Sequence, residues 1–407
     1  MQQTSAKTQI PWLIIICGCI IALLAFGPRS AMGFFQLPML ADTGWDRTTF
    51  GLAMATQNLL WGFSQPVFGA LADKYGAWRM LSLGALLYAA GLTMMAFPYS
   101  PAMLHVGGGV LVGVGVGACS FGIILAAFAR NTAPEQRSLV FGFGTAAGSA
   151  GMFLFAPISQ GLIEAVGWSD ALIWISILML TIPVLAIPLR GNAATSPVTT
   201  EEISQTAAEA LREAFSHQSY LLLVAGFFVC GFHVAFISAH FPAYLSDVGI
   251  EAKYAVISIA LIGFLNIFGS LASGILGQKY SKPLILVWLY LGRSIAITAF
   301  ILVPPSPTSV VLFSMALGFL WLSTIAPTNA LVAIMFGTRH LGMLGGLVFF
   351  SHQIGSFLGV WLGGYLYDKT GSYDPVWWIG IALGIFAAIV HWPIKERAVD
   401  RPAVAAA

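Results

Sequence analysis

The sequence predicts an all-α membrane protein whose twelve transmembrane helices form two six-helix halves. Of its 407 residues, 58% are hydrophobic and only 8% are charged, whereas about a quarter of the residues of a soluble domain are charged. The apolar residues gather in long runs, and a helix needs about 20 such residues to cross a bilayer. These two observations exclude a soluble enzyme. The length of the chain therefore indicates a number of transmembrane helices rather than a number of soluble domains.

Proline, glycine and clusters of charge divide the apolar sequence into twelve runs. The first run begins near Pro11 and has no small-residue cleavage site, so we expect it to remain as a helix rather than to be removed as a signal peptide. The predicted spans are residues 12–40, 48–72, 79–98, 102–128, 138–163 and 169–189, followed by residues 219–246, 252–277, 283–303, 307–335, 341–366 and 375–394.

The only long polar stretch lies between the sixth and seventh runs and divides the chain. We expect residues 1–190 to form an N-terminal six-helix bundle, 191–217 a linker, 218–397 a C-terminal six-helix bundle and 398–407 a flexible tail. With the N-terminus inside the cell, thirteen Lys and Arg residues of the connections fall on the cytoplasmic side and three on the other. Since positive charge favours the cytoplasmic side, we expect both termini there, in the inner membrane of the cell.

The two predicted halves resemble each other in sequence. Residues 69–75 (GALADKY), after the second run, match residues 274–280 (GILGQKY), after the eighth, at Gly, Leu, Lys and Tyr. Two parallel repeats fit a secondary transporter with a substrate site near the bilayer midplane, between the halves. A channel or a membrane enzyme would not need this symmetry.

Several partners are excluded by composition. The net charge of +2 and the absence of a basic cluster argue against nucleic acid. The four cysteines lie inside apolar runs without metal-ligand spacing, so we expect neither a metal site nor a cofactor. The expected partners are the lipid bilayer, protons and a small solute, and we expect the monomer to be functional.

The segment 69–79 (GALADKYGAWR) resembles the signature between helices 2 and 3 of the major facilitator superfamily. The resemblance implies a gate at this end of the molecule, formed by Gly69, Asp73, Gly76 and Arg79. Asp73 stands at a helix end, where it can pair with Arg79 or face the N-terminal dipole of a neighbouring helix. The second copy has Gly277 and Gln278 in place of Ala72 and Asp73, so the gate is expected to be asymmetric.

Within that superfamily, two further segments resemble the monocarboxylate and oxalate/formate carriers. In residues 27–35 (GPRSAMGFF), Arg29 occupies the position of the cation that contributes to carboxylate binding in monocarboxylate transporters. Residues 363–373 (GGYLYDKTGSY) resemble a Gly/Asp/Gly/Tyr pattern of the same branch. The chain departs from the pattern in helix 8, where Asn266 and Ser270 replace an Asp and an Arg.

The placement of the charged residues also indicates an anionic substrate, independently of the resemblance. All sixteen acids fall in connections or at helix ends, whereas Arg29 and Arg293 lie inside apolar runs. A cation in the hydrocarbon region costs roughly 2.5–3.5 kcal/mol, so it normally faces a wet cavity or carries function. For Arg29 we weigh substrate contact against snorkelling to the outer surface. For Arg293, which lies midway along helix 9, donation to helix carbonyls is weighed equally with ligand contact.

Three histidines also lie at membrane depth, and histidine is the side chain that titrates near neutral pH. His233 and His240 are seven residues apart and share one face of helix 7, and His352 is on helix 11. Because every Asp and Glu lies in a connection or at a helix end, no buried acid is available, and we expect one of the three to couple transport to protons. The alternatives are that the proton travels with the substrate, or that transport is exchange or uniport.

Polar side chains in helices 2 and 10 complete the predicted substrate site. Asn58 and Trp61 are expected to line the cavity from helix 2, and Trp321 and Asn329 from helix 10, where Pro327 can kink the helix. The alternative is that amide and hydroxyl groups hold helices together. The glycines of helices 4 and 5 are interpreted as packing surfaces.

Two functions remain open. The first is transport of a small organic anion, a monocarboxylate, by alternating access with proton symport. The second is proton-driven efflux of an apolar drug or metabolite, which the 52 aromatic residues could accommodate. An exporter of cationic drugs would need a buried acid, and the spans contain none.

Overall fold

The computed structural model describes residues 10–132, 137–190, 205–337 and 340–399, without the side chains of Asp73, Ala129 and residues 137–139. Over these residues the chain is helical and contains no strand. The first half contains α1 (Trp12–Ser30), α2 (Gly33–Thr43), α3 (Arg47–Tyr75), α4 (Ala77–Ala96), α5 (Pro101–Leu104), η1 (His105–Leu111), α6 (Val112–Ala118), α7 (Phe121–Asn131), α8 (Arg137–Val166), α9 (Trp168–Met179), α10 (Ile182–Leu185) and η3 (Ile187–Leu189). The rest contains α11 (Ala207–Ser216), α12 (Gln218–Asp247), α13 (Ala252–Lys279), α14 (Lys282–Leu302), α15 (Pro307–Leu320), α16 (Ile325–Phe336), α17 (Leu341–Thr370) and α18 (Asp374–His391).

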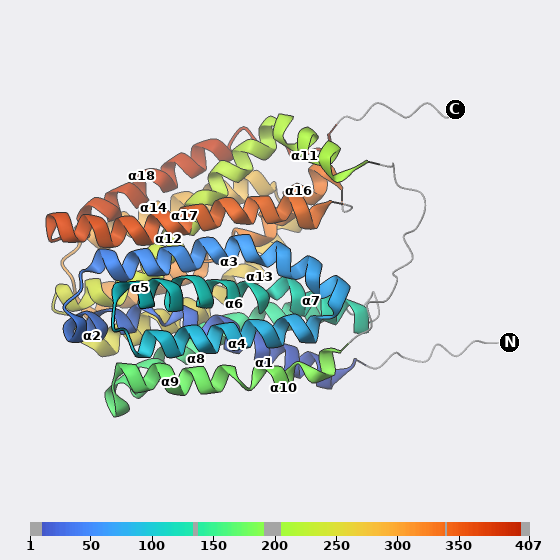
Figure 1. Ribbon diagram of the computed structural model, residues 1–407. Coiled ribbons are helices and arrows are strands. Elements are labelled where there is room, and N and C mark those ends of the chain that lie inside the picture. The colour runs from blue at the N-terminus through green and yellow to red at the C-terminus, as the bar shows by residue number, and fades with distance from the viewer. Residues whose placement is uncertain (1–9, 133–136, 191–204, 338–339, 400–407) are drawn as a thin grey trace, which may run out of the picture.

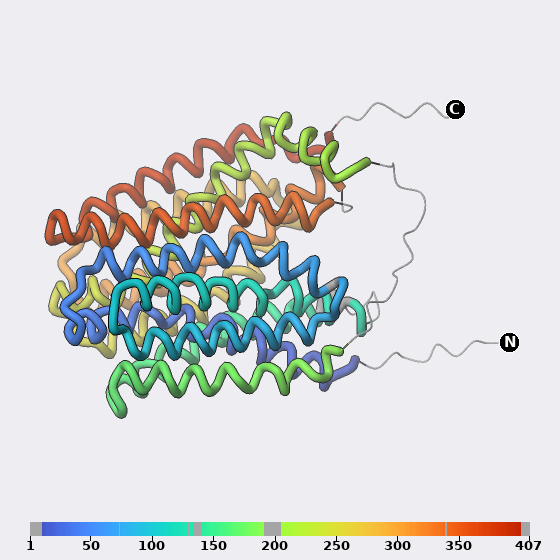
Figure 2. The backbone as a smooth tube through the Cα atoms, viewed as in Figure 1, coloured from blue at the N-terminus to red at the C-terminus, as the bar shows by residue number. Residues whose placement is uncertain are grey.

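The long helices lie side by side in one bundle (Figure 1). The blue-to-green first half and the yellow-to-red second half form two layers, and the trace in Figure 2 shows α3 running along α17 where the layers meet. We call the end where α1 begins and α18 ends the terminal end, and the end where α2 leads into α3 the distal end. The cavity described below depends on this division.

Eleven of the described segments are long and apolar enough to cross a membrane. Each corresponds to one predicted span. The boundaries differ by a few residues, except that the first segment ends at Ser30 whereas the predicted span reaches residue 40. The remaining predicted span is α3, which has 29 residues and is less apolar because it carries polar side chains such as Gln57 and Asn58. These two side chains are only 2% and 4% exposed, so they face protein rather than lipid.

Two of the interrupted spans carry residues of the predicted site. The first span divides into α1 and α2 just after Arg29, where Pro28 removes one backbone donor and the Ser30 hydroxyl donates to the Gly27 carbonyl at 2.7 Å. The tenth span divides into α15 and α16 over residues 321–324. Sequence analysis placed a kink around Pro327. The break begins six residues earlier, and Pro327 lies in the first turn of α16, where its missing N–H costs little.

The glycines of the fourth span pack against neighbouring helices. A Cβ atom at Gly113 would lie 2.6 Å from the Gln57 carbonyl oxygen, and one at Gly115 would lie 2.8 Å from the Gly84 carbonyl oxygen. Any larger side chain would force α6 away from α3 and α4. Part of this span, η1, is π-helical, which the sequence did not predict.

The linker and the C-terminal segment are described only in part. Residues 191–204 and 400–407 lie outside the described residues. Within the linker, α11 begins with a capping box in which Thr206 and Glu209 satisfy each other's backbone N–H groups. The last described residue, Val399, donates its backbone N–H to the Met335 carbonyl at 3.0 Å.

Candidate functional site

Arg29 lies near the middle of the bundle, on the last turn of α1. Its Nη2 donates to Asn58 Oδ1, and its guanidinium lies 4.3 Å from the ring centroid of Trp61. Both partners come from α3, the second predicted span. No described carboxylate pairs with this cation, and the side chain is half-buried. The structure therefore places Arg29, Asn58 and Trp61 together, as sequence analysis expected of a site, and does not place Arg29 at the bilayer surface.

Aromatic rings connect this cluster to the second half. Trp61 is in edge contact with Phe349 of α17, with ring centroids 5.3 Å apart. Phe349 in turn stacks on His352, at 5.6 Å. Trp61 is also in edge contact with Phe26, at 5.6 Å, and Phe26 lies 4.2 Å from Phe121 between ring centroids. The cluster thus spans both halves of the bundle.

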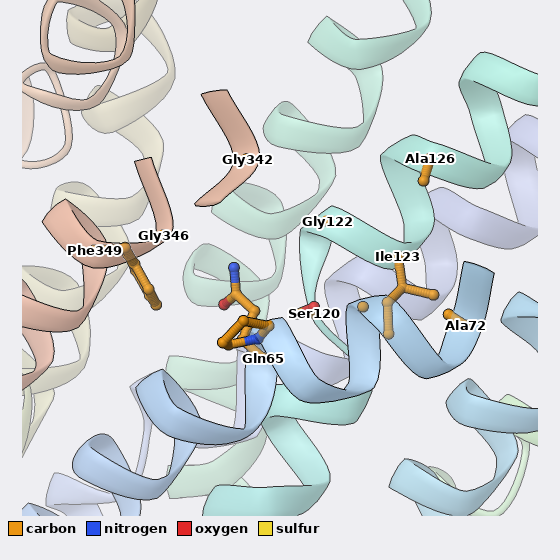
Figure 3. Close-up of a pocket in the computed structure, with 11 residues that line it drawn as sticks. Gln65, Ala72, Ser120, Gly122, Ile123, Ala126, Gly342, Gly346 and Phe349 are labelled. Carbon is orange, nitrogen blue, oxygen red and sulfur yellow. The ribbon is translucent and has the colours of Figure 1, made fainter. Parts of the chain in front are cut away.

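A cavity of about 220 Å³ lies on the terminal side of this cluster, and Phe349 is the residue that belongs to both. Figure 3 shows Gln65 of α3 and Phe349 of α17 approaching it from opposite sides, with Ser120 beside them. Small residues such as Gly69, Gly342 and Gly346 line the rest. The cavity therefore separates α3 from α17 in the terminal half of the bundle.

Three buried N–H groups around this cluster have no hydrogen-bond partner. They are Arg29 Nε, Trp61 Nε1 and Gln353 Nε2. Gln353 is fully buried on α17, and it packs so closely on α3 that a Cβ at Gly62 would lie 2.6 Å from its Cγ. Sequence analysis missed Gln353, because one amide within an apolar run is usually a contact between helices. Unpaired buried donors are rare and call for an acceptor.

The second intramembrane arginine has a different environment. Arg293 is 1% exposed and donates from Nε and Nη2 to the Leu320 carbonyl, at 3.1 and 2.7 Å, and from Nη2 to the Trp321 carbonyl. These carbonyls belong to the end of α15, where the helix break leaves them without N–H partners. Sequence analysis weighed two roles for Arg293, donation to helix carbonyls and contact with a ligand. These contacts are those of the first role.

The same break brings Trp321 into the core and leaves Asn329 apart. Trp321 is 2% exposed, whereas Asn329 is exposed on α16 beside Gly345. Asn266 stabilises the break, since its Oδ1 accepts from the Leu322 backbone N–H at 2.9 Å. Its Nδ2 donates to Ser149 of α8 at 3.0 Å, so this amide also links the halves.

The structure separates the three histidines. His233 Nε2 lies 2.7 Å from the Gly380 carbonyl of α18, which is away from the cavity. His240 Nε2 lies 2.8 Å from the Val360 carbonyl near the distal end. Only His352, which stacks on the cavity-lining Phe349 and lies 3.0 Å from Gln353 Oε1, adjoins the Arg29 cluster.

The four residues of the predicted gate lie at the terminal end. Gly69 lines the cavity, and Gly76 joins α3 to α4 with a φ of +93°, a conformation that glycine adopts without strain. Arg79 is exposed, and its Nη1 donates to the Tyr75 carbonyl at 3.4 Å. The side chain of Asp73 lies outside the described part of the structure, so its pairing stays a prediction.

A charged cluster at the distal end was not predicted. Arg47, at the start of α3, makes a two-pronged ion pair with Asp247 of α12 at 2.6 and 2.7 Å. It also donates to the Tyr373 hydroxyl at 2.9 Å. Asp368 of α17 accepts from the backbone N–H groups of Arg47 and Thr48, at 3.3 and 2.6 Å. We call Arg47, Thr48, Asp247, Asp368 and Tyr373 the distal cluster.

The distal cluster joins the halves in a partly desolvated setting. Burial raises the pKa of the Tyr373 hydroxyl above its usual range, so this group stays neutral beside Arg47. The hydroxyl also lies 3.1 Å from His240 Nδ1. A signal was present in the sequence, since Arg47, Asp247 and Asp368 are opposite charges at the same ends of three spans. Their separation by 200 or more residues concealed the pairing.

Comparison with known proteins gives consistent results. The chain is 27% identical over 366 residues to monocarboxylate transporter 13 of Bos taurus, covering 89% of this chain and 84% of that protein. It is 24% identical to YcxA, an uncharacterized MFS-type transporter of Bacillus subtilis (strain 168), with 96% of each chain covered. Among solved structures, a D-xylose–proton symporter matches with a TM-score of 0.73 at 15% identity, covering 96% of this chain and all of that one.

The sequence profile of the superfamily covers most of the chain. It matches residues 16–359, which include the Arg29 cluster, the cavity and the predicted gate. The relatives are transporters, as the resemblance in the sequence implied, and the fold is that of solved transporters. The chain is therefore a multi-pass membrane transporter that belongs to the Major Facilitator Superfamily.

Proposed function

We propose that this transporter moves a small organic anion, a monocarboxylate, by alternating access with proton symport. The observation that carries the proposal is the unpaired cation at the centre of the bundle. Arg29 has no described carboxylate partner, and its Nε is a buried donor without an acceptor. A guanidinium binds a carboxylate through two parallel hydrogen bonds, so a bound anion would complete this site.

The neighbouring groups support the same substrate class. Trp61 Nε1 and Gln353 Nε2 add two donors from opposite halves. A substrate that bridges them would contact both halves at once, which is what alternating access requires of a central site. The printed names of the relatives support the proposal as well, since one is a monocarboxylate transporter and one solved neighbour is a proton symporter.

We further propose that both termini lie in the cytoplasm and that the protein resides in the cell membrane. Thirteen basic residues of the connections would then be cytoplasmic and three external. Two six-helix bundles, residues 1–190 and 218–397, would move against each other about the linker. In this orientation the cavity opens to the cytoplasm and the distal cluster closes the outer side.

Efflux of an apolar drug is the weaker candidate. The rings of Phe26, Trp61, Phe121 and Phe349 could bind an apolar body. An apolar ligand would leave the three donors unpaired, however, at a cost of about 1–3 kcal/mol for each group.

The test is uptake of labelled mono- and dicarboxylates into proteoliposomes. We expect Arg29→Gln to abolish uptake while the protein still inserts and folds, and Arg29→Lys to keep partial activity, because the charge remains without the fork. Arg397→Gln is the matched control, since it removes an exposed arginine beyond α18. Normal uptake by Arg29→Gln would refute the proposal.

A further inference from the structure

We infer that His240 is a proton-binding site through which acid opens the distal end. This role goes beyond the proposed function, because it concerns the distal closure and holds for any substrate. Two observations carry it. In the closed end the proton-accepting nitrogen of the ring is surrounded by donors, and the charges of the distal cluster are divided unequally between the two halves.

His240 is fully buried, and its contacts determine which ring nitrogen carries the hydrogen. Nε2 lies 2.8 Å from the Val360 carbonyl oxygen, which can only accept, so the hydrogen is on Nε2. Nδ1 is therefore the atom that can bind a further proton. It lies 3.1 Å from the Tyr373 hydroxyl and 3.3 Å from Gln36 Nε2, and both of these groups approach it as donors.

Tyr373 connects the ring of His240 to the cation of the distal cluster. Its hydroxyl oxygen accepts from Arg47 Nη1 at 2.9 Å, and its own hydrogen is directed at Nδ1. A proton on Nδ1 would place a second cationic donor on this oxygen. Turning the Gln36 amide would offer Oε1, which has no partner, but the new charge would still lack water and lie near Arg47. The closed end therefore disfavours a charged His240.

The charges near His240 belong to different halves. Arg47 comes from α3 of the first half, whereas Asp247, Asp368 and His240 itself come from α12 and α17 of the second. Arg47 and Asp368 both interact electrostatically with the ring. The charged and titratable groups of the elements around it are Arg47 of α3, Tyr244 and Asp247 of α12, Tyr367 and Asp368 of α17, and Tyr373 and Asp374 at the start of α18.

Opening the distal end removes Arg47 and leaves the two carboxylates in the half that contains His240. Water then reaches the ring, and both changes favour the charged imidazolium, which takes the place of the departed cation. The closed state thus binds fewer protons than the open state, so the closure is intact at high pH and is lost as the pH falls. One proton changes the ratio of open to closed molecules by up to tenfold for each unit of pH.

The proton returns to the distal side when that end closes again. His240 therefore responds to the pH on the distal side without carrying a proton across the membrane, which distinguishes its role from that of a coupling residue.

The test measures the opening of the distal end directly. Spin labels at the exposed positions Tyr99 and Lys369, one on each half, report whether this end is open. With substrate-free protein in nanodiscs, we expect the ratio of open to closed molecules to rise roughly tenfold between about pH 8 and about pH 5. An equilibrium that stays constant over this range would overturn the inference.

A pair of histidine variants assigns the response to one ring. His240→Gln should abolish the rise. His233→Gln is the matched control and should keep it, because His233 is equally buried on the same helix but contacts the Gly380 carbonyl of α18. If His240→Gln opens in acid as the unmodified protein does, the carboxylates of the distal cluster carry the response and the inference is wrong.

A further variant tests the same nitrogen without removing the ring. Gln36→Glu places a carboxylate where the Gln36 amide lies 3.3 Å from Nδ1. The closed end can then hold the proton in an ion pair with His240, so acid should no longer open it. This variant keeps the test decisive if His240→Gln does not fold, and an acid-driven opening equal to that of the unmodified protein would contradict the assignment.

These measurements contain neither substrate nor a proton gradient, so they are separate from the test of the proposed function. If the distal end does not respond to acid, His240 lacks this role and the anion site at Arg29 stands. If Arg29→Gln takes up carboxylates normally, the proposed substrate is wrong and the acid response of the distal end is unaffected.

Discussion

The helices α3 and α17 meet differently at the two ends of the bundle. Near the distal end they touch through backbone, and the ion pair of Arg47 and Asp247 lies beside the contact. Near the terminal end the same two helices are separated by a cavity lined by Gly69, Gly342 and Gly346. One pair of helices therefore forms a charged closure at one end and an apolar opening at the other.

This difference shows which interactions have to change during transport. Opening the distal end requires that the distal cluster be separated and its charges hydrated. Closing the terminal end requires that small residues such as Gly69, Gly342 and Gly346 come together across the cavity. The closed distal end is thus held by a few strong contacts, each of which can be removed singly.

The largest expected effect comes from removing the central cation of the distal cluster. Arg47→Gln breaks a pair whose side chains are 10% and 26% exposed. We expect the equilibrium to shift toward the distal-open state by about 2 kcal/mol, roughly thirtyfold, a value between those of surface and buried pairs. Distances between spin labels at Tyr99 and Lys369, on opposite halves of the distal end, would measure the shift.

The control for this prediction is a second ion pair at the same end. Lys253 and Glu251 are 58% and 68% exposed, so Lys253→Gln should leave the equilibrium nearly unchanged, because water screens this pair. Equal shifts in the two variants would show that net charge, rather than the buried contact, keeps the distal end closed.

The next largest effect distinguishes the histidine beside the terminal cavity from the two that lie away from it. His352 adjoins the cavity, whereas His240 belongs to the closed end and His233 faces α18. We expect His352→Gln to exchange substrate without concentrating it under a gradient of one pH unit, a loss of up to tenfold in accumulation for one proton. His233→Gln and His240→Gln should still concentrate substrate.

Uptake by the unmodified protein should rise as the external medium is acidified, because proton symport draws on the inward proton gradient. Counterflow and gradient-driven uptake, measured in the same proteoliposomes, separate exchange from coupling. If His352→Gln still accumulates substrate, the proton instead travels with the carboxylate or along water.

The smallest effect comes from a pair of glycines on α17. A Cβ at Gly364 would lie 2.4 Å from the Arg47 carbonyl oxygen, whereas one at Gly346 would have nothing within 4 Å. Gly364→Ala should therefore weaken the distal closure by about 1 kcal/mol, roughly fivefold, and Gly346→Ala should leave it unchanged. The spin-label distances above provide the measurement, and equal behaviour of the two variants would contradict the packing argument.

Most of the fold could be predicted from hydropathy, because a bilayer requires long apolar helices and little else produces them. The boundaries of the eighth span, 252–277 predicted and Ala252–Lys279 observed, show how well charge and glycine mark helix ends. The break at residues 321–324 was displaced from Pro327, because it depends on Arg293 and Asn266 from other helices. Such contacts leave no local pattern in the sequence.

The sequence indicated part of the candidate site, and most strongly the residue that is costly to bury. Arg29 was identified because a cation at membrane depth is energetically costly and normally has a functional role. Gln353 was not identified, since burying an amide costs little free energy and amides are common where helices contact each other. Arg47 was counted only among the charges of the connections, because a residue at a helix end is expected to be exposed to water. Its partners became evident once the helices were assembled.

The distal end is closed by charges and the terminal end by small apolar residues, so salt and temperature should act differently on the two ends. Separating the distal cluster exposes charges to water, so added salt should ease it by screening. Closing the terminal cavity instead removes apolar surface from water, which carries a negative change in heat capacity. Ionic strength would thus govern the opening of the distal end, and temperature the closing of the terminal end.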